Sequence, residues 1–298
     1  LFVGMAIRVI GGVVNILLDP VFIFGFDMDI AGAAAATVIA QTASCVFVLW
    51  TLKSRKMRIP VRLAKPESAL GKQILAIGFS PFLILATDSL IIIALNTVLQ
   101  YYGGAEYGDT LITAATIVQS YMLLITSPML GVTSGSQPLI SFNYGAGKPE
   151  RIRRTIFWVL LLCLGFTTVM FFVSRILPQY FVRIFTNVPE YQELSVWGIR
   201  VFTLMIIPLS LQYVFVDALT ALSMTRISLG LSLLRKSLYL GSTCVLPLFF
   251  AARSAFYAEP LADVLAASVT SVLFFGIYRK RLSGNGVLLG EGKNRRLA

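Results

Sequence analysis

Long apolar runs separated by short polar connections make up most of the chain. Each run is long enough to cross a bilayer as an α-helix, which takes about 20 residues. None shows the strict alternation of a membrane β-strand. The pattern therefore predicts an all-α integral membrane protein with eight transmembrane helices, near residues 1–24, 30–52, 76–100, 110–140, 155–175, 194–222, 232–251 and 258–278.

Composition and charge placement support a membrane protein. The chain is 57% hydrophobic and only 13% charged, with a mean hydropathy of +0.81, whereas soluble domains are about 45–50% apolar. Most of its 25 Lys and Arg residues fall in alternate connections, at 53–75, 148–154, 226–236 and 279–296. This alternation follows the positive-inside rule. It predicts that these connections and the C-terminus are cytoplasmic, and it explains the net charge of +11 without a nucleic-acid partner.

The titratable side chains exclude several enzyme classes. The chain has no His, which removes a Ser-His-Asp triad and His-ligated zinc. Its three Cys residues lie singly in predicted spans, where small buried hydrophobes are the ordinary use. The string GAGKPE at 145–150 lacks the first Gly and the Ser/Thr of a phosphate loop. We therefore expect no enzyme activity and no cofactor.

Two polar residues interrupt the first apolar run, NILLDPVFIFG at 15–25. A carboxylate deep in a bilayer costs about 2.5 kcal/mol or more, so it normally faces a cavity and marks an ion or proton path. Asn15 lies one helical turn before Asp19 and on the same face. The alternative is that Asp19 caps a turn before Pro20.

Two further aspartates lie inside later apolar runs. Asp88 is in GFSPFLILATDSLIIIALN (78–96), and Asp217 follows Tyr213 by four residues in LQYVFVDALTAL (211–222), a spacing that brings phenol and carboxylate together on a helix. These three residues are candidate cation ligands, with a structural hydrogen bond between helices as the alternative. Asp263, which follows Glu259 near the outer end of the last run, is equally explained by packing or capping.

A long run that contains Pro128, Gly131 and Pro138 is expected to form a bent helix. Gln137 and Asn143 lie near its cytoplasmic end. They are candidates for a substrate path, and kink geometry alone is the alternative.

The two ends of the chain repeat one another. Residues 1–53 align with residues 228–280 without a gap, and the alignment matches Arg8 with Arg235 and Pro20 with Pro247. Both segments would cross the membrane in the same sense, as in a parallel repeat of two lobes. If the first two helices close one lobe, a complete protein would have four further helices before Leu1.

Three strings resemble the multidrug and toxic compound extrusion (MATE) transporters. They are NILLDPVFIFGFDMDIAGAAAATVIAQ (15–41), GVTSGSQPLISFNYGAGKPERIRR (131–154) and YAEPLADVLA (257–266). Members of that family have twelve helices in two lobes of six. The resemblance implies the last two helices of an N-terminal lobe at 1–53, a cytoplasmic linker at 54–75, a complete C-terminal six-helix lobe at 76–280, and a basic cytoplasmic tail at 281–298.

The resemblance also implies roles for the polar residues. In similar transporters the Asn and Asp that match Asn15 and Asp19 line an internal cavity with a Thr, here Thr37. An acidic residue occupies the place of Asp88, commonly as Glu, and the Tyr213–Asp217 spacing recurs. The shorter Asp88 leaves open whether Na⁺ or H⁺ is the coupling ion, and no other metal is expected.

The function implied is efflux of cationic or lipophilic drugs by antiport with Na⁺ or H⁺, from a monomer in the inner (plasma) membrane. One alternative is a related lipid-linked oligosaccharide flippase, which should place several Arg residues in its cavity. Only Arg8 and Arg200 are candidates for that in the predicted spans. A channel, an inert scaffold or an inactive fragment are the others.

Overall fold

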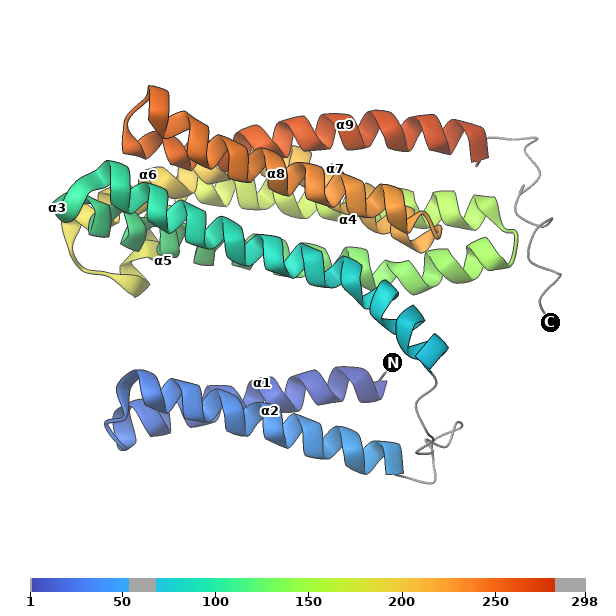
Figure 1. Cartoon of the computed structure of the whole chain (residues 1–298), viewed down its shortest axis with the longest axis horizontal. Helices are drawn as coiled ribbons and strands as arrows, with labels where there is room; N and C mark the ends of the chain where they lie inside the picture. The colour runs from blue at the N-terminus through green and yellow to red at the C-terminus, as the bar shows by residue number, and fades with distance from the viewer. Residues whose placement is uncertain (1, 54–67, 282–298) are drawn as a thin grey trace. The chain divides into compact units, whose positions relative to one another are not determined.

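A computed structural model describes residues 2–53 and 68–281, and these residues are helical almost throughout (Figure 1). The chain divides into two compact units, Leu1–Gln73 and Ile74–Ala298.

The first unit is a helical hairpin. Helix α1 (Phe2–Pro20) continues into a π-helical turn, η1 (Val21–Gly25), and α2 (Asp29–Lys53) returns alongside it. Small residues allow close contact: a Cβ on Gly32 would lie 2.9 Å from the carbonyl of Phe22. Close packing of this kind drives helix association in membranes, where lipid and side chains are equally apolar.

The second unit begins with two helices joined by a sharp reversal. Helix α3 (Ser68–Gly145) changes direction at Gly104, whose φ of 74° and ψ of −176° lie in a region that is essentially restricted to glycine. The reversal separates two apolar segments, Phe82–Gly104 and Tyr107–Gly145. Figure 1 shows them as the cyan and green arms of one hairpin.

The remaining helices complete the second unit. They are α4 (Pro149–Ile176), α5 (Pro178–Phe185), α6 (Pro189–Phe202), the 3₁₀ turn η2 (Thr203–Met205), α7 (Ile206–Ala221), α8 (Thr225–Phe249), the 3₁₀ segment η3 (Ala252–Tyr257) and α9 (Ala258–Arg281). Proline at the first position starts α4, α5 and α6, because its missing N–H would be unpaired there anyway. Helix α7 packs against α4, α8 and α9, so its side chains lie in the interior of this unit.

All eight predicted runs lie in helices, but the count of eight spans remains a prediction. Among the described residues, six helical segments are long and apolar enough to cross a membrane. The apolar helix Val9–Gly25 is shorter, and α8 is not one of the six. Arg235 and Lys236 lower the hydropathy of α8, and the structure places both inside it.

The predicted domain limits can be compared only in part. Helix α3 begins at Ser68, inside the range assigned to the linker. The remainder of the predicted linker, 54–67, and the tail from 282 onward lie outside the described residues.

Candidate functional site: a charged cavity in the second unit

A cavity of about 340 Å³ in the second unit collects the candidate residues of three helices. Asp88 comes from α3, Tyr213 and Asp217 from α7, and Arg235 and Lys236 from α8. Apolar side chains complete its wall, as in most small-molecule sites. The structure therefore brings together the three residues that the sequence predicts as cation ligands in this half of the chain. Their role stays a prediction.

Asp217 is the buried acid of this cavity. Thr133 and Gln137, both on α3, provide hydrogen bonds to its carboxylate. Its Oδ2 atom is buried and has no hydrogen-bond partner among the described residues. A buried carboxylate oxygen without a partner is costly, so a proton or cation there would stabilise the site.

Of the two predicted substrate-path residues, only Gln137 lies beside this site. Asn143 is buried, and its Nδ2 donates to the carbonyl of Leu139 at 2.8 Å on its own helix. It does not line the cavity. A role for Asn143 in a substrate path gains no support from the arrangement.

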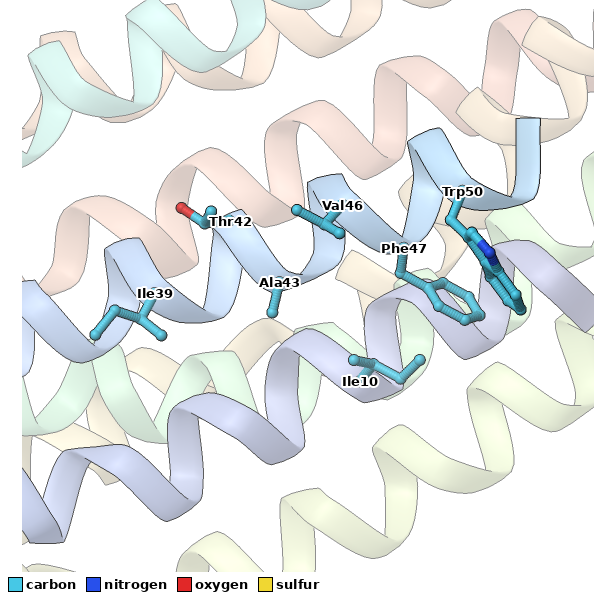
Figure 2. A pocket seen from close by; sticks show the side chains of 7 residues that line it. All are labelled: Ile10, Ile39, Thr42, Ala43, Val46, Phe47 and Trp50. Carbon is cyan, nitrogen blue, oxygen red and sulfur yellow. The ribbon is translucent and has the colours of Figure 1, made fainter. Parts of the chain in front are cut away.

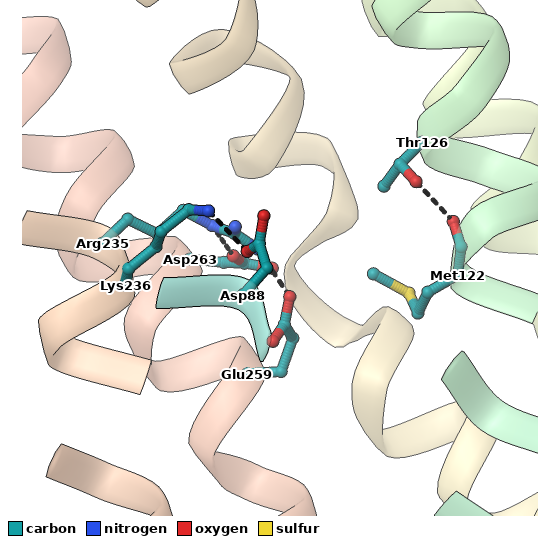
Figure 3. A network of polar contacts seen from close by, with 7 residues as sticks. All are labelled: Asp88, Met122, Thr126, Arg235, Lys236, Glu259 and Asp263. Atoms are coloured by element: carbon teal, nitrogen blue, oxygen red, sulfur yellow. Dashed lines mark hydrogen bonds and ion pairs between the residues drawn. The ribbon is translucent and has the colours of Figure 1, made fainter. Parts of the chain in front are cut away.

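Asp88 is already paired. The Nζ atom of Lys236 lies 2.5 Å from Asp88 Oδ1 and also donates to the carbonyl of Ile84 at 2.6 Å. Figure 3 shows the ammonium reaching across to this carboxylate. The Lys236 side chain is 9% exposed, whereas that of Asp88 is 53% exposed. A cation that binds Asp88 must therefore displace the Lys236 ammonium or share the carboxylate with it.

The position of Arg235 and Lys236 corrects the sequence interpretation. Their basic character placed them in a cytoplasmic connection at 226–236, but α8 runs from Thr225 to Phe249 and holds both in its interior. One signal could have found them: the internal repeat aligns Arg235 with Arg8, which the apolar pattern had already placed inside a span.

Arg235 forms a second charged group with α9. It donates to Glu259 Oε1 at 2.5 Å and to Asp263 Oδ1 at 2.8 Å. Asp263 has a fully buried side chain, which excludes a capping role at a solvent-exposed helix end. The spacing of Glu259 and Asp263, one helical turn apart, was the available signal.

These pairings bear on the flippase alternative, which expects cationic side chains free to bind a phosphate. Arg235 and Lys236 do lie at the cavity, but Asp88, Glu259 and Asp263 already offset them. With Asp217, four carboxylates face two cations. The local charge is negative when all are ionised, which favours a cationic ligand and not an anionic one.

The first unit holds the other predicted group. The Nδ2 atom of Asn15 donates to Asp19 Oδ1 at 3.2 Å and to Thr37 Oγ1 at 3.4 Å. The structure thus brings these three together as expected. Pro20 is helical, with φ −63° and ψ −35°, so Asp19 does not start a turn. The π-helical segment η1 follows directly, and such segments are frequent at functional sites.

The first unit also contains a larger, open hollow that carries no ion chemistry. It measures about 770 Å³ and is lined by seven side chains, six of them from α2 and one, Ile10, from α1 (Figure 2). Trp50 and Phe47 lie at one end, and Thr42 is the only polar lining residue. Its chemistry suits lipid or an apolar group, so the charged cavity of the second unit is the better functional candidate.

Known proteins of one family match this chain. The family model MatE matches residues 82–251, a segment that contains the cavity residues Asp88, Tyr213, Asp217, Arg235 and Lys236. The multidrug export protein MepA of Staphylococcus aureus (strain MSSA476) is 25% identical over 284 residues, which cover 93% of this chain and 60% of that protein. The chain therefore spans less than two thirds of the length of this relative.

Solved structures show the same fold. A MATE protein in complex with MaL6 superposes with a TM-score of 0.78 at 20% identity, covering 92% of this chain and 62% of that one. A MOP superfamily transporter from Pyrococcus furiosus, whose title describes a binding pocket of reverse polarity, gives a TM-score of 0.77 at 20% identity with the same coverage.

Proposed function

Because the chain belongs to the MATE family of membrane transporters, we propose that it takes part in the efflux of cationic or lipophilic drugs by antiport with Na⁺ or H⁺. MepA is named as a multidrug export protein, which supports this substrate class. The bacterial relatives also support a multi-pass protein of the plasma membrane, with its C-terminus in the cytoplasm as the charge pattern predicts.

One observation carries the proposal: acidic side chains share a cavity with a phenol and apolar walls. The apolar wall suits the lipophilic part of a drug, while Asp217 and Asp88 suit its positive charge. A proton or Na⁺ suits the same carboxylates. When one cation is bound, the charge that attracts the other is cancelled.

This competition can drive exchange. If the empty, negatively charged cavity does not change orientation easily, the cavity must leave one side of the membrane carrying either the drug or the coupling ion. The ion gradient then determines which is carried outward. We propose that rocking of the two lobes alternates the access, as in other transporters built from repeats.

Replacing Asp217 by Asn tests this proposal. In cells that express the protein, efflux of ethidium should fall to the background of cells without it, because the amide removes the negative charge at nearly constant shape. Asp109→Asn, at an exposed position outside the cavity lining, is the matched control and should retain efflux. Efflux by Asp217→Asn equal to that of the control would reject Asp217 as a cation ligand.

A further inference from the structure

A buried charged cluster beside the cavity has more negative than positive groups. Arg235 on α8 bridges Glu259 and Asp263 on α9 (Figure 3). The side chains of these three are 15%, 10% and 0% exposed, respectively. With both carboxylates ionised, the cluster carries one uncompensated negative charge in a water-poor interior.

Other neighbouring groups do not supply the missing positive charge. The phenols of Tyr213 on α7 and Tyr239 on α8 face the cluster, and Tyr239 shares a hydrogen bond with Glu259. Neither phenol is cationic. Lys236, the nearest other cation on α8, is directed to Asp88 and not to α9.

One atom of the cluster is unsatisfied. Asp263 Oδ1 accepts a hydrogen bond from Arg235 Nε, but Asp263 Oδ2 is buried and has no partner among the described residues. An ionised buried oxygen without a partner is among the least favourable arrangements in a protein interior. A proton on Oδ2 removes the excess charge and leaves the hydrogen bond from Arg235 to Oδ1 intact.

We propose that Arg235, Glu259 and Asp263 form a proton-binding site in which Asp263 Oδ2 holds an exchangeable proton. A metal ion fits less well, since the described residues contain no group of three or more His, Cys, Asp or Glu arranged to hold one. A hydrated cation would also need room around Asp263, whose side chain is completely enclosed.

Arg235 connects this site with the cavity. It lines the cavity, and its guanidinium carbon lies 5.9 Å from the centre of the Tyr213 ring. A drug cation beside Arg235 adds positive charge close to the cluster, which favours loss of the Asp263 proton to water. Its departure allows the reverse. This coupling rests on the proposed function, and it names H⁺ as the coupling ion.

Infrared spectroscopy of the purified protein tests the proton site without any transport. At neutral pH the wild type should show the C=O band of a protonated carboxylic acid, shifted in D₂O. Asp263→Asn should remove this band. Glu259→Gln should remove it too, because Arg235 and Asp263 alone form a neutral pair and Asp263 then ionises.

Glu193→Gln, at an exposed position away from the cluster, is the control and should leave the band unchanged. Circular dichroism checks that each variant folds, and if Asp263→Asn does not fold, Glu259→Gln gives the deciding readout. A wild type without the band, or a band that persists in the folded variants, overturns the proposal.

A second measurement tests the coupling separately. Tetraphenylphosphonium added to wild-type protein in weakly buffered detergent solution should release protons, detected with a pH dye. Asp263→Asn should bind the probe and release none. Proton release from this variant equal to that of the wild type would overturn the coupling, whereas failure of the wild type to bind the probe at all would count against the proposed function.

Discussion

Lys236 controls what Asp88 can bind. Its ammonium occupies the carboxylate and is anchored by the carbonyl of Ile84, so it acts as a tethered cation at the place where the sequence predicts a mobile one. Like charges a few ångströms apart in a protein interior repel by several kcal/mol at an effective dielectric of about 20. A ligand cation therefore binds next to Asp88 only at the expense of this pair.

Lys236→Met should strengthen the binding of a cationic drug. Removing the ammonium frees Asp88 while keeping an apolar side chain of similar length, and we expect the dissociation constant for ethidium to fall about tenfold, or ~1.4 kcal/mol. Fluorescence titration of the purified protein measures this constant. The exposed Lys148→Met is the matched control, and the double variant Asp88→Asn/Lys236→Met should lose the gain. Unchanged affinity in Lys236→Met would show that Lys236 does not compete.

Asp19 is expected to act in transport through its charge. Asp19→Asn keeps a side chain that can bond with Asn15 but removes the anion, so ethidium efflux should fall several-fold while the protein still folds. Asp27→Asn is the control, because Asp27 is exposed and its φ of 50° is well tolerated by Asn. Equal efflux in the two variants would contradict a role for the Asp19 carboxylate.

At the level of elements, the repeat seen in the sequence reappears as two helical hairpins. Each has a long first helix with proline near its end, a short irregular segment, and a second helix: α1, η1 and α2 in one, and α8, η3 and α9 in the other. The two charged groups that were hardest to predict lie on the second hairpin. They are there because α8 and α9 pack together along their length.

The reversal at Gly104 is the element most sensitive to a single methyl group. Its φ and ψ are accessible essentially to glycine alone, so Gly104→Ala should destabilise the fold by about 1–3 kcal/mol. Thermal unfolding in detergent should show a lower midpoint. Gly131→Ala, inside the same helix with open space at its Cβ, should instead be neutral or gain up to about 1 kcal/mol. A midpoint for Gly104→Ala at or above that of Gly131→Ala would contradict this account.

At the scale of the whole molecule, the net local charge determines the ligand class. Carboxylates outnumber cations around the cavity even though Arg235 and Lys236 enter it. The fold alone would not decide this, since one structural neighbour is titled for a pocket of reverse polarity.

If Asp263 supplies the exchanged proton, drug transport should follow the pH gradient. In vesicles that contain the active transporter, a protonophore should abolish uptake of ethidium, and replacement of Na⁺ by choline should leave the initial rate unchanged. The physical reason is that the cluster encloses a proton but has no room for a hydrated ion. Uptake that needs Na⁺ and resists the protonophore would place the coupling ion at Asp88 and Asp217 instead.

The amino-acid sequence alone determined the membrane class, the helical runs, the internal repeat and the acids Asp19, Asp88 and Asp217. Each of these follows from local patterns: run length, spacing by one helical turn, and the cost of a charge in an apolar segment. The grouping of Asn15, Asp19 and Thr37 was also predictable, because a single hairpin brings them together.

Only the tertiary structure decided the partners of the charges. Asp88 and Lys236 are far apart in the chain, and their pairing depends on how α8 packs against the first half of α3. A basic residue near the end of an apolar run reads equally well as a cytoplasmic anchor or as a buried counter-ion. Long-range packing settles which it is, because the same ammonium is stable either in water or against a buried carboxylate.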